Sequence, residues 1–281
     1  MSTEFSVVPI EFEDDPGTEA RMLQHYAGRR NWIVSLASVA VGLCVWEGLT
    51  AAGILPPALL PSITEVARAG LRVATEGFQG VTLLEDIEIS LLRVGMGFIM
   101  AVAVGVPLGL WIGTSRLVES ALDPFIQFLR PLPPLGYYTL LIVWFGIGDT
   151  SKVILLFLTG LPIIVVGSAV GVRSINRDLL LATSSLGLNG TQLFRFVVFP
   201  ACLPAIFTSM RLALGATFGS LVAAELIAAE SGLGWLILTA SNYVRTAIVF
   251  SGIIVIGLIA LALDHGVVVI ERKLVPWAGR T

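Results

Sequence analysis

Residues 153–172 read VILLFLTGLPIIVVGSAVGV and contain no charged side chain. A helix of this length rises about 30 Å, which matches the thickness of the hydrocarbon core of a bilayer. Backbone groups at that depth find no water, so the stretch predicts a helix, which satisfies its own hydrogen bonds. The segment therefore indicates a membrane-spanning helix.

The rest of the 281-residue chain has the same apolar character. Apolar residues make up 56% of it and charged residues only 13%, whereas soluble domains carry about 25% charged residues. The net charge of -3 provides no basic face for nucleic acid. Cys44 and Cys202 lie in or beside apolar segments without the spacing of metal ligands. The composition predicts an integral membrane protein without nucleic-acid, zinc or disulfide chemistry.

Six membrane spans are expected when the search extends outward from residues 153–172. Four further runs are clear, and they cover Trp32 to Ala52, Ile89 to Ile112, Pro204 to Ala228 and Ala247 to Ile270. The sixth, residues 135–147, is too short to span unless residues 123–130 form its first turns. The prolines at 131, 133 and 134 would then break that helix.

The charges beside the spans predict how the chain crosses the membrane. Residues 1–30 are acidic and form a solvated tail, and the apolar run after them is too long for a cleavable signal peptide. Lys and Arg are in excess on one side of the spans, which places both termini in the cytoplasm. Residues 54–86 then form an extracytoplasmic loop with a short interfacial helix. The expected location is the bacterial inner membrane.

The loop of residues 173–203 is too long for a plain connection and has the pattern of two helices joined by a turn. Asn176 or Asp178 is suited to cap the first helix, and Gly187 can adopt the left-handed conformation that ends it. Residues 191–199 then resume a helical pattern. The loop is thus expected to be a structured element on the cytoplasmic side.

Prolines follow the second of these helices. Pro200 and Pro204 are expected to stop it before the next span, since proline lacks the N–H that a helix interior requires. Residues 189–191 match a glycosylation acceptor pattern, yet on the cytoplasmic side they are better explained as a turn.

Residues 181–183, 187 and 197–200 resemble the signature of permease subunits in ATP-binding-cassette importers. That signature reads Glu-Ala-Ala, three residues, Gly, nine residues, and Ile-x-Leu-Pro. Ala182, Gly187 and Pro200 fit it, whereas Leu181 and Thr183 depart from it. In that family the signature forms a coupling helix that lies in a groove of the ATPase subunit.

Three further blocks extend the resemblance over roughly residues 89–277. They are RPLPP at 130–134, WFGIGDTSK at 144–152 and LVAAELIA at 221–228, and they resemble the nitrate, sulfonate and taurine branch of these permeases. The Ser-Gly-Leu-Gly turn at 231–234 and the Lys-Leu-Val-Pro-Trp ending at 273–277 are most similar to taurine permeases.

The resemblance implies an all-α, MetI-like type I importer permease with six transmembrane helices. The permease domain would occupy residues 31–281, with its core at about 87–272 and its coupling loop at about 173–203. The residues implied in ATPase coupling are Ala182, Thr183, Ser184, Leu186, Gly187, Leu188, Asn189, Gln192, Leu193, Arg195 and Pro200.

The resemblance also implies partners and a solute. A homodimer would form the path, together with two ATP-binding subunits and a periplasmic or lipid-anchored substrate-binding protein. The chain itself would need no cofactor, because ATP and Mg would be bound by the ATPase subunits. The solute would be a small organic anion or zwitterion, taurine or another sulfonate, with nitrate or bicarbonate as alternatives.

The sequence offers little for catalysis. It has no Gly-x-x-x-x-Gly-Lys-Ser/Thr phosphate cradle. His25 and His265 are its two histidines, and neither belongs to a nucleophile or metal-ligand arrangement. No enzyme activity is expected, although a secondary transporter or channel driven by an ion gradient is an alternative. That alternative is weaker because no inverted repeat is evident.

Glu225 is the main candidate for the translocation pathway or its gate. It lies among small residues in a predicted span, where helices can approach closely. Two interpretations stand equally. The carboxylate lines the path or gate, or it is a buried group fixed by Arg93, Arg130 or the backbone.

Three aromatic residues near the proline break are further pathway candidates. Tyr137 and Tyr138 follow the break, and discontinuous helices at membrane depth often line a solute cavity, although packing is an equal alternative. Trp144 lies near the expected outer boundary, where a tryptophan also serves as an interface anchor.

Overall fold

The computed structural model describes residues 32–277, so the tail expected at residues 1–30 lies outside the described part. The chain divides into two compact units, residues 1–55 and 56–281. The described part of the first unit is mainly helix α2 (Trp32–Ala51), a 20-residue apolar helix. Its length is that of one membrane crossing.

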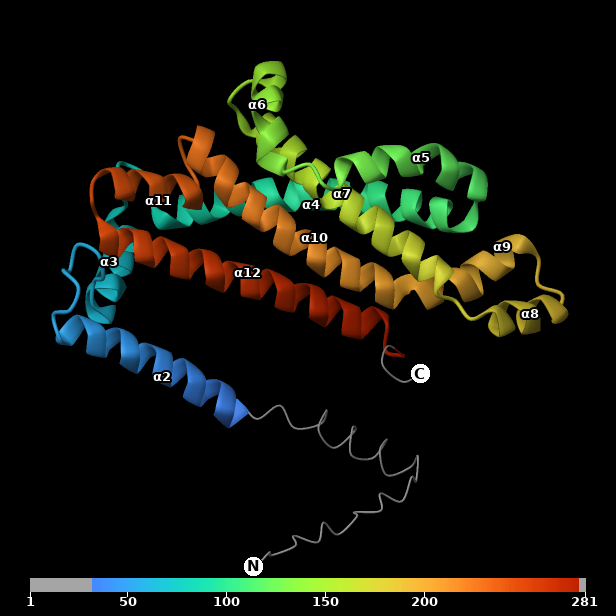
Figure 1. Ribbon diagram of the computed structural model, residues 1–281, viewed down its shortest axis with the longest axis horizontal. Coiled ribbons are helices and arrows are strands. Elements are labelled where there is room, and N and C mark those ends of the chain that lie inside the picture. The colour runs from blue at the N-terminus through green and yellow to red at the C-terminus, as the bar shows by residue number, and fades with distance from the viewer. Residues whose placement is uncertain (1–31, 278–281) are drawn as a thin grey trace, which may run out of the picture. The chain divides into compact units, whose positions relative to one another are not determined.

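The second unit consists of helices joined by short turns (Figure 1). They are α3 (Ile63–Glu76), α4 (Leu83–Thr114), α5 (Arg116–Leu129), α6 (Pro134–Phe145), α7 (Asp149–Arg173), α8 (Arg177–Ser185), α9 (Gly190–Leu193), the π-helix η1 (Phe194–Val198), α10 (Phe199–Ala228), α11 (Leu233–Asn242) and α12 (Thr246–Leu274). Figure 1 shows α3 and α11 at one end of this unit and α8 and α9 at the other.

Five helices in the described residues are long and apolar enough to cross a membrane, and they confirm the five clear spans. They are α2, α4, α7, the continuous stretch from α9 through α10, and α12. The sixth expected span corresponds to α6, whose 12 residues rise only about 18 Å. The break before α6 lies where the prolines predicted it, so α6 approaches membrane thickness only together with α5.

The centre of the second unit is the packing of α4 against α7 and α10. Small residues recur every fourth position on the α4 face that meets α7, at Gly97, Ala101, Gly105 and Gly109. A β-carbon at Gly109 would overlap the Val165 carbonyl and the Ser168 side chain of α7. Close backbone approach of this kind holds helices together in lipid, where hydrophobic burial contributes little.

Helix α4 begins at Leu83, six residues earlier than the span predicted from Ile89. Thr82 and Glu85 form a capping box, in which the Glu85 N–H donates to Thr82 Oγ1 at 3.3 Å and the Thr82 N–H donates to Glu85 at 2.8 Å. The expected boundary was late because a search for apolar residues passes over these polar first turns. The segment expected to be an extracytoplasmic loop contains the expected short helix, α3.

The prediction that Pro200 and Pro204 stop a helix is wrong. The chain continues from α9 through η1 into α10, and Pro204 lies inside α10. In η1 the Phe199 N–H donates to the Phe194 carbonyl, which is the wider π-helical pattern. A wider turn gives a proline ring room that a regular helix would not, so the span absorbs Pro200 without ending.

Candidate functional site

The connection between α7 and α10 has the predicted helix–turn–helix structure. The Asn176 side chain accepts a hydrogen bond from the Asp178 N–H at 2.9 Å and so caps α8. Gly187 has φ +78°, which ends the first helix in the left-handed region. Asn189 and Gln192 then form a capping box with bonds of 2.9 and 3.1 Å. Local signals therefore determine this segment.

One side of the α8–α9 segment packs against the core of the second unit, and the other side is exposed on the single chain. Leu180 and Leu193 pack with the buried cluster of Leu110, Val198, Cys202 and Ile206. In contrast, Leu181 is 66% exposed and Leu186 is 80% exposed. Of the residues implied in coupling, Ala182, Leu186, Gly187, Asn189, Gln192 and Arg195 are exposed, and Thr183, Leu188, Leu193 and Pro200 are half-buried. Ser184 lies in α8. The segment gathers these residues on one protruding element.

Glu225 is fully buried near the end of α10. Its carboxylate accepts a hydrogen bond from Arg93 Nη1 at 2.7 Å and one from the Ser90 hydroxyl at 2.9 Å, both from α4. Arg93 also pairs with Asp149 at the start of α7, at 2.7 Å. One ionic group thus connects α4, α7 and α10.

The same group holds the start of α11. Three successive N–H groups donate to side chains, namely Gly232 to Asp86 at 2.7 Å, Leu233 to Ser90 at 3.0 Å and Gly234 to Glu225 at 2.9 Å. The first N–H groups of a helix have no partner within it, and acidic side chains favour that end. Gly232 has φ +115°, and a β-carbon there would overlap the Glu225 carboxylate. We call Asp86, Ser90, Arg93, Asp149 and Glu225 the polar node.

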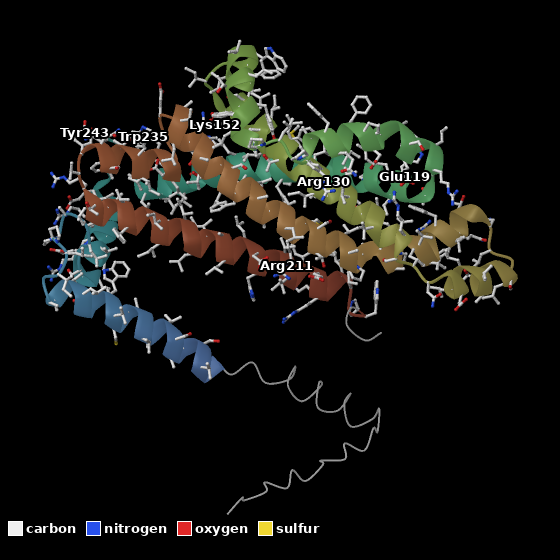
Figure 2. The ribbon with its side chains drawn as sticks, in the orientation of Figure 1. Glu119, Arg130, Lys152, Arg211, Trp235 and Tyr243 are labelled. Carbon is white, nitrogen blue, oxygen red and sulfur yellow. The ribbon has the colours of Figure 1, made fainter. Side chains whose placement is uncertain are left out.

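The geometry around Glu225 corresponds to the interpretation as a fixed carboxylate, and Arg93 is its cation. Its side chain has no exposed surface, and it lies toward the end of the unit that carries α11. Arg130, the other cation considered, is elsewhere. Figure 2 shows Arg130 between Trp235 near one end of the unit and Glu119 toward the other.

The three aromatic candidates do not gather in one cavity. Tyr138 is fully buried and packs in a cluster with Leu155 and Ala224. Tyr137 is half-buried and lines a cavity together with Arg130. Trp144 is 64% exposed and meets Phe145 edge to face, with 6.5 Å between ring centroids. Each of the three therefore has a different environment.

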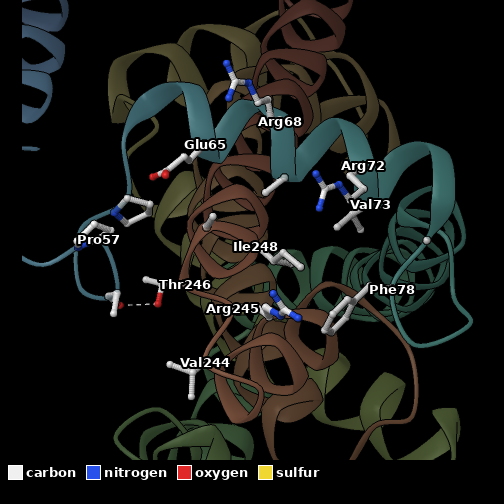
Figure 3. A pocket seen from close by; sticks show the side chains of 15 residues that line it. Pro57, Glu65, Arg68, Arg72, Val73, Phe78, Val244, Arg245, Thr246 and Ile248 are labelled. Carbon is white, nitrogen blue, oxygen red and sulfur yellow. Dashed lines mark hydrogen bonds between the residues drawn. The ribbon is translucent and has the colours of Figure 1, made fainter.

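A cavity of about 640 Å³ lies between α3 and the turn that joins α11 to α12 (Figure 3). Thr246 Oγ1 donates to the Ala58 carbonyl at 2.6 Å and ties its two sides together. Val244 holds φ +54°, which is unfavourable for a β-branched residue. Three arginines, Arg68, Arg72 and Arg245, line this space together with one carboxylate, Glu65, as Figure 3 shows. The cations outnumber the single carboxylate, so the lining carries an excess of positive charge.

The sequence argument named Glu225 but missed most of its partners in the polar node. Asp86, Ser90, Arg93 and Gly97 follow one another at intervals of three or four on α4, so they lie on one helical face. That polar stripe at the start of an apolar helix was the available signal. Asp149, at the start of α7, gave no comparable signal.

These features define a class of protein. The described residues form several membrane-crossing helices, one end of the second unit carries a protruding helical segment, and within residues 32–277 no three His, Cys, Asp or Glu side chains gather as metal ligands. This is the architecture of a multi-pass membrane protein. The chain belongs to the family of binding-protein-dependent transport system inner membrane components, because the sequence pattern of that family matches residues 105–276.

Relatives place the chain in one branch of that family. It is 38% identical to the taurine transport system permease protein TauC of Escherichia coli (strain K12), over 89% of this chain and 91% of TauC. It is 34% identical to the putative aliphatic sulfonates transport permease protein SsuC of the same organism, over 88% and 94%. It is 33% identical to the nitrate import permease protein NrtB of Synechocystis, over 68% and 70%. The chain is an ABC importer permease of the taurine, sulfonate and nitrate branch.

The fold is also that of a solved importer. A structure described as an inward-facing conformation of the MetNI methionine ABC transporter matches with a TM-score of 0.61 and 16% identity, over 68% of this chain and 95% of that chain. This confirms the MetI-like fold of type I importers.

Proposed function

We propose that this chain is the membrane-spanning subunit of an ATP-driven importer for a small organic sulfonate, with taurine as the first candidate. The names of TauC and SsuC support the sulfonate class. Nitrate, the solute in the name of NrtB, is the alternative within the branch. A sulfonate carries one negative charge, so a chain that handles it needs cations near the path.

The exposed α8–α9 segment is the observation that carries the ATP-driven mechanism. Exposed apolar residues that stand together on an otherwise anchored element indicate a protein partner. Leu181 and Leu186 provide such a surface, while Leu180 and Leu193 connect the segment to the core. An ATPase subunit seated there would move α10 directly, because η1 continues into α10 without a break. ATP and Mg belong to that subunit.

A second copy of the chain would complete the path. Gly215 and Gly219 lie one turn apart on α10, and open space surrounds the position of a β-carbon at each. A helix face with this spacing favours close approach of another helix in a membrane. Closed twofold dimers are the common arrangement of identical subunits. We therefore assign the α10 face with these glycines to the interior of a homodimer.

The cavity at the α3 and α11 end is suited to delivery of the solute. Its Arg72 and Arg245 side chains favour an approaching protein with acidic residues at its rim, and such charges mainly accelerate association. We assign this end to the substrate-binding protein. The polar node would hold α11, which leads into the turn that lines this cavity, through its hydrogen bonds to the first N–H groups of that helix.

The test is whether the chain brings an ATPase subunit with it. The permease should be purified from its native membrane by a tag on the chain, and the intact complex should be weighed by native mass spectrometry. Two permease chains with two ATPase subunits are expected. A monomer that retains uptake in vesicles without any ATPase would instead support an ion-gradient-driven secondary transporter.

A further inference from the structure

Arg130 directly follows the last residue of α5, and its charged side chain lies beside the middle of two membrane-crossing helices, α7 and α10. Its N–H still donates to the Ile126 carbonyl at 3.0 Å, and the prolines that follow prevent the helix from continuing. The side chain lines a cavity with Ile163 of α7 and Leu212 of α10, both close to the middle of their helices. Arg130 is therefore near half depth.

Two cavities meet at Arg130, with volumes of about 500 and 350 Å³. The first also exposes Thr208, and the second also contains Tyr137. The Thr208 hydroxyl donates to the Pro204 carbonyl at 2.9 Å, so its oxygen retains capacity to accept a hydrogen bond. The surroundings of the guanidinium thus combine apolar walls with a few polar groups, as small-molecule sites do.

The Arg130 charge has no counter-ion in the described part of the chain. The arginines that form ion pairs there are Arg93, Arg173 and Arg211. Arg130 is exposed on the surface of the single chain. A charge at this depth is costly in lipid, and such residues face the bundle interior or a water-filled cavity. The face with Arg130 must accordingly meet something other than acyl chains.

We propose that Arg130 forms an oxyanion-binding site halfway along the translocation path, with Thr208 and Tyr137 beside it. The site takes the sulfonate group of the solute, and it rests on the proposed function because a second copy of the chain must cover this face. The permease then recognises its solute itself, in addition to any selection by the binding protein.

The chemistry of the site follows from its side chains. A guanidinium offers a planar fork of N–H donors that suits two oxygens of a tetrahedral oxyanion. The Thr208 oxygen can accept from the ammonium group of a zwitterion such as taurine. No carboxylate lines either cavity, so nothing within them competes for Arg130. A single cation without further charged donors binds an anion only moderately, and moderate binding suits a site on a transport path because the solute must also leave it.

Cysteine labelling tests the site without requiring transport. In the complete complex, Cys44→Ser and Cys202→Ala remove the native thiols, and Thr208→Cys places one beside Arg130. The two reagents are the anionic sulfonatoethyl and the cationic trimethylammonioethyl methanethiosulfonates. Arg130→Gln should lower the ratio of anionic to cationic labelling rates at least fivefold, and Arg130→Lys should preserve it. The control Arg116→Gln removes a charge at the other end of α5 and should change the ratio less than twofold. A thiol that does not react from water, or an unchanged ratio in Arg130→Gln, would overturn the proposal.

Uptake of radiolabelled taurine and ethanesulfonate by the reconstituted complex gives a second readout. Arg130→Gln should lower uptake at least tenfold, and Arg130→Lys should restore part of it. Wild-type uptake in Arg130→Gln would refute the site. If the wild-type complex transports neither probe, the proposed function fails, and the labelling ratio still decides whether Arg130 faces an aqueous anion site.

Discussion

Glu225→Gln is expected to destabilise the protein by about 2–4 kcal/mol, because three donors converge on that carboxylate. Arg93, Ser90 and the Gly234 N–H contact it at 2.7, 2.9 and 2.9 Å. Glutamine offers one acceptor oxygen, so a buried donor loses its partner at a cost of about 1–3 kcal/mol. The bond to Arg93 also loses its charge on the acceptor side, which weakens it by about 1 kcal/mol. Arg93 retains Asp149, which limits the total.

The measurement is the free energy of unfolding of the purified chain in mixed micelles, from reversible denaturation by SDS. The matched control is Glu119→Gln, since Glu119 pairs with Arg173 at 2.8 Å but both side chains are partly exposed. That change should cost at most about 1 kcal/mol, as exposed ion pairs contribute little. Stability of Glu225→Gln within 1 kcal/mol of wild type would refute the role of the node. Loss of uptake with unchanged stability would assign Glu225 to passage of the solute instead.

Two other changes test the two ends of the second unit. Gly187→Val should abolish solute-dependent ATP hydrolysis and uptake, since a β-branched residue at φ +78° costs about 1–3 kcal/mol and the turn after α8 would change its conformation. The control is Gly190→Ala, because Gly190 has a helical backbone and open space around the position of a β-carbon. Normal coupling in Gly187→Val would show that the segment has no coupling role. Replacing Arg72 and Arg245 together by Gln should raise the binding-protein concentration for half-maximal uptake about tenfold and weaken its salt dependence. The control Arg116→Gln removes a charge that does not line this cavity and should change neither. Equal behaviour of the two variants would show that the cavity does not receive the binding protein.

The sequence was a good guide wherever the determining signal was local. Asn176, Gly187 and Asn189 act on neighbours within a few positions, so the α8–α9 segment could be predicted almost residue by residue. The apolar spans followed from length alone. Pro200 misled the prediction because its effect depends on whether the preceding turn widens, and a π-helical turn is not evident from residue types.

The polar node could be predicted only in part because its members are far apart in the sequence. Ser90 and Glu225 are separated by 135 positions, and Arg93 and Asp149 by 56. Periodicity places Ser90 and Arg93 on one face of α4, but it does not say which helix that face meets. Arg130 and Arg93 were equal candidates for Glu225 on sequence grounds, and only the packing of α4 against α10 separates them.

The most direct test of the importer account is uptake in reconstituted vesicles that contain the permease and its ATPase subunits. Radiolabelled taurine is added outside with the binding protein, and ATP is sealed inside. Uptake should require both the internal ATP and the binding protein, and ionophores that dissipate ion gradients should leave it unchanged. Uptake that proceeds without ATP and stops when the ion gradient is removed would contradict the account.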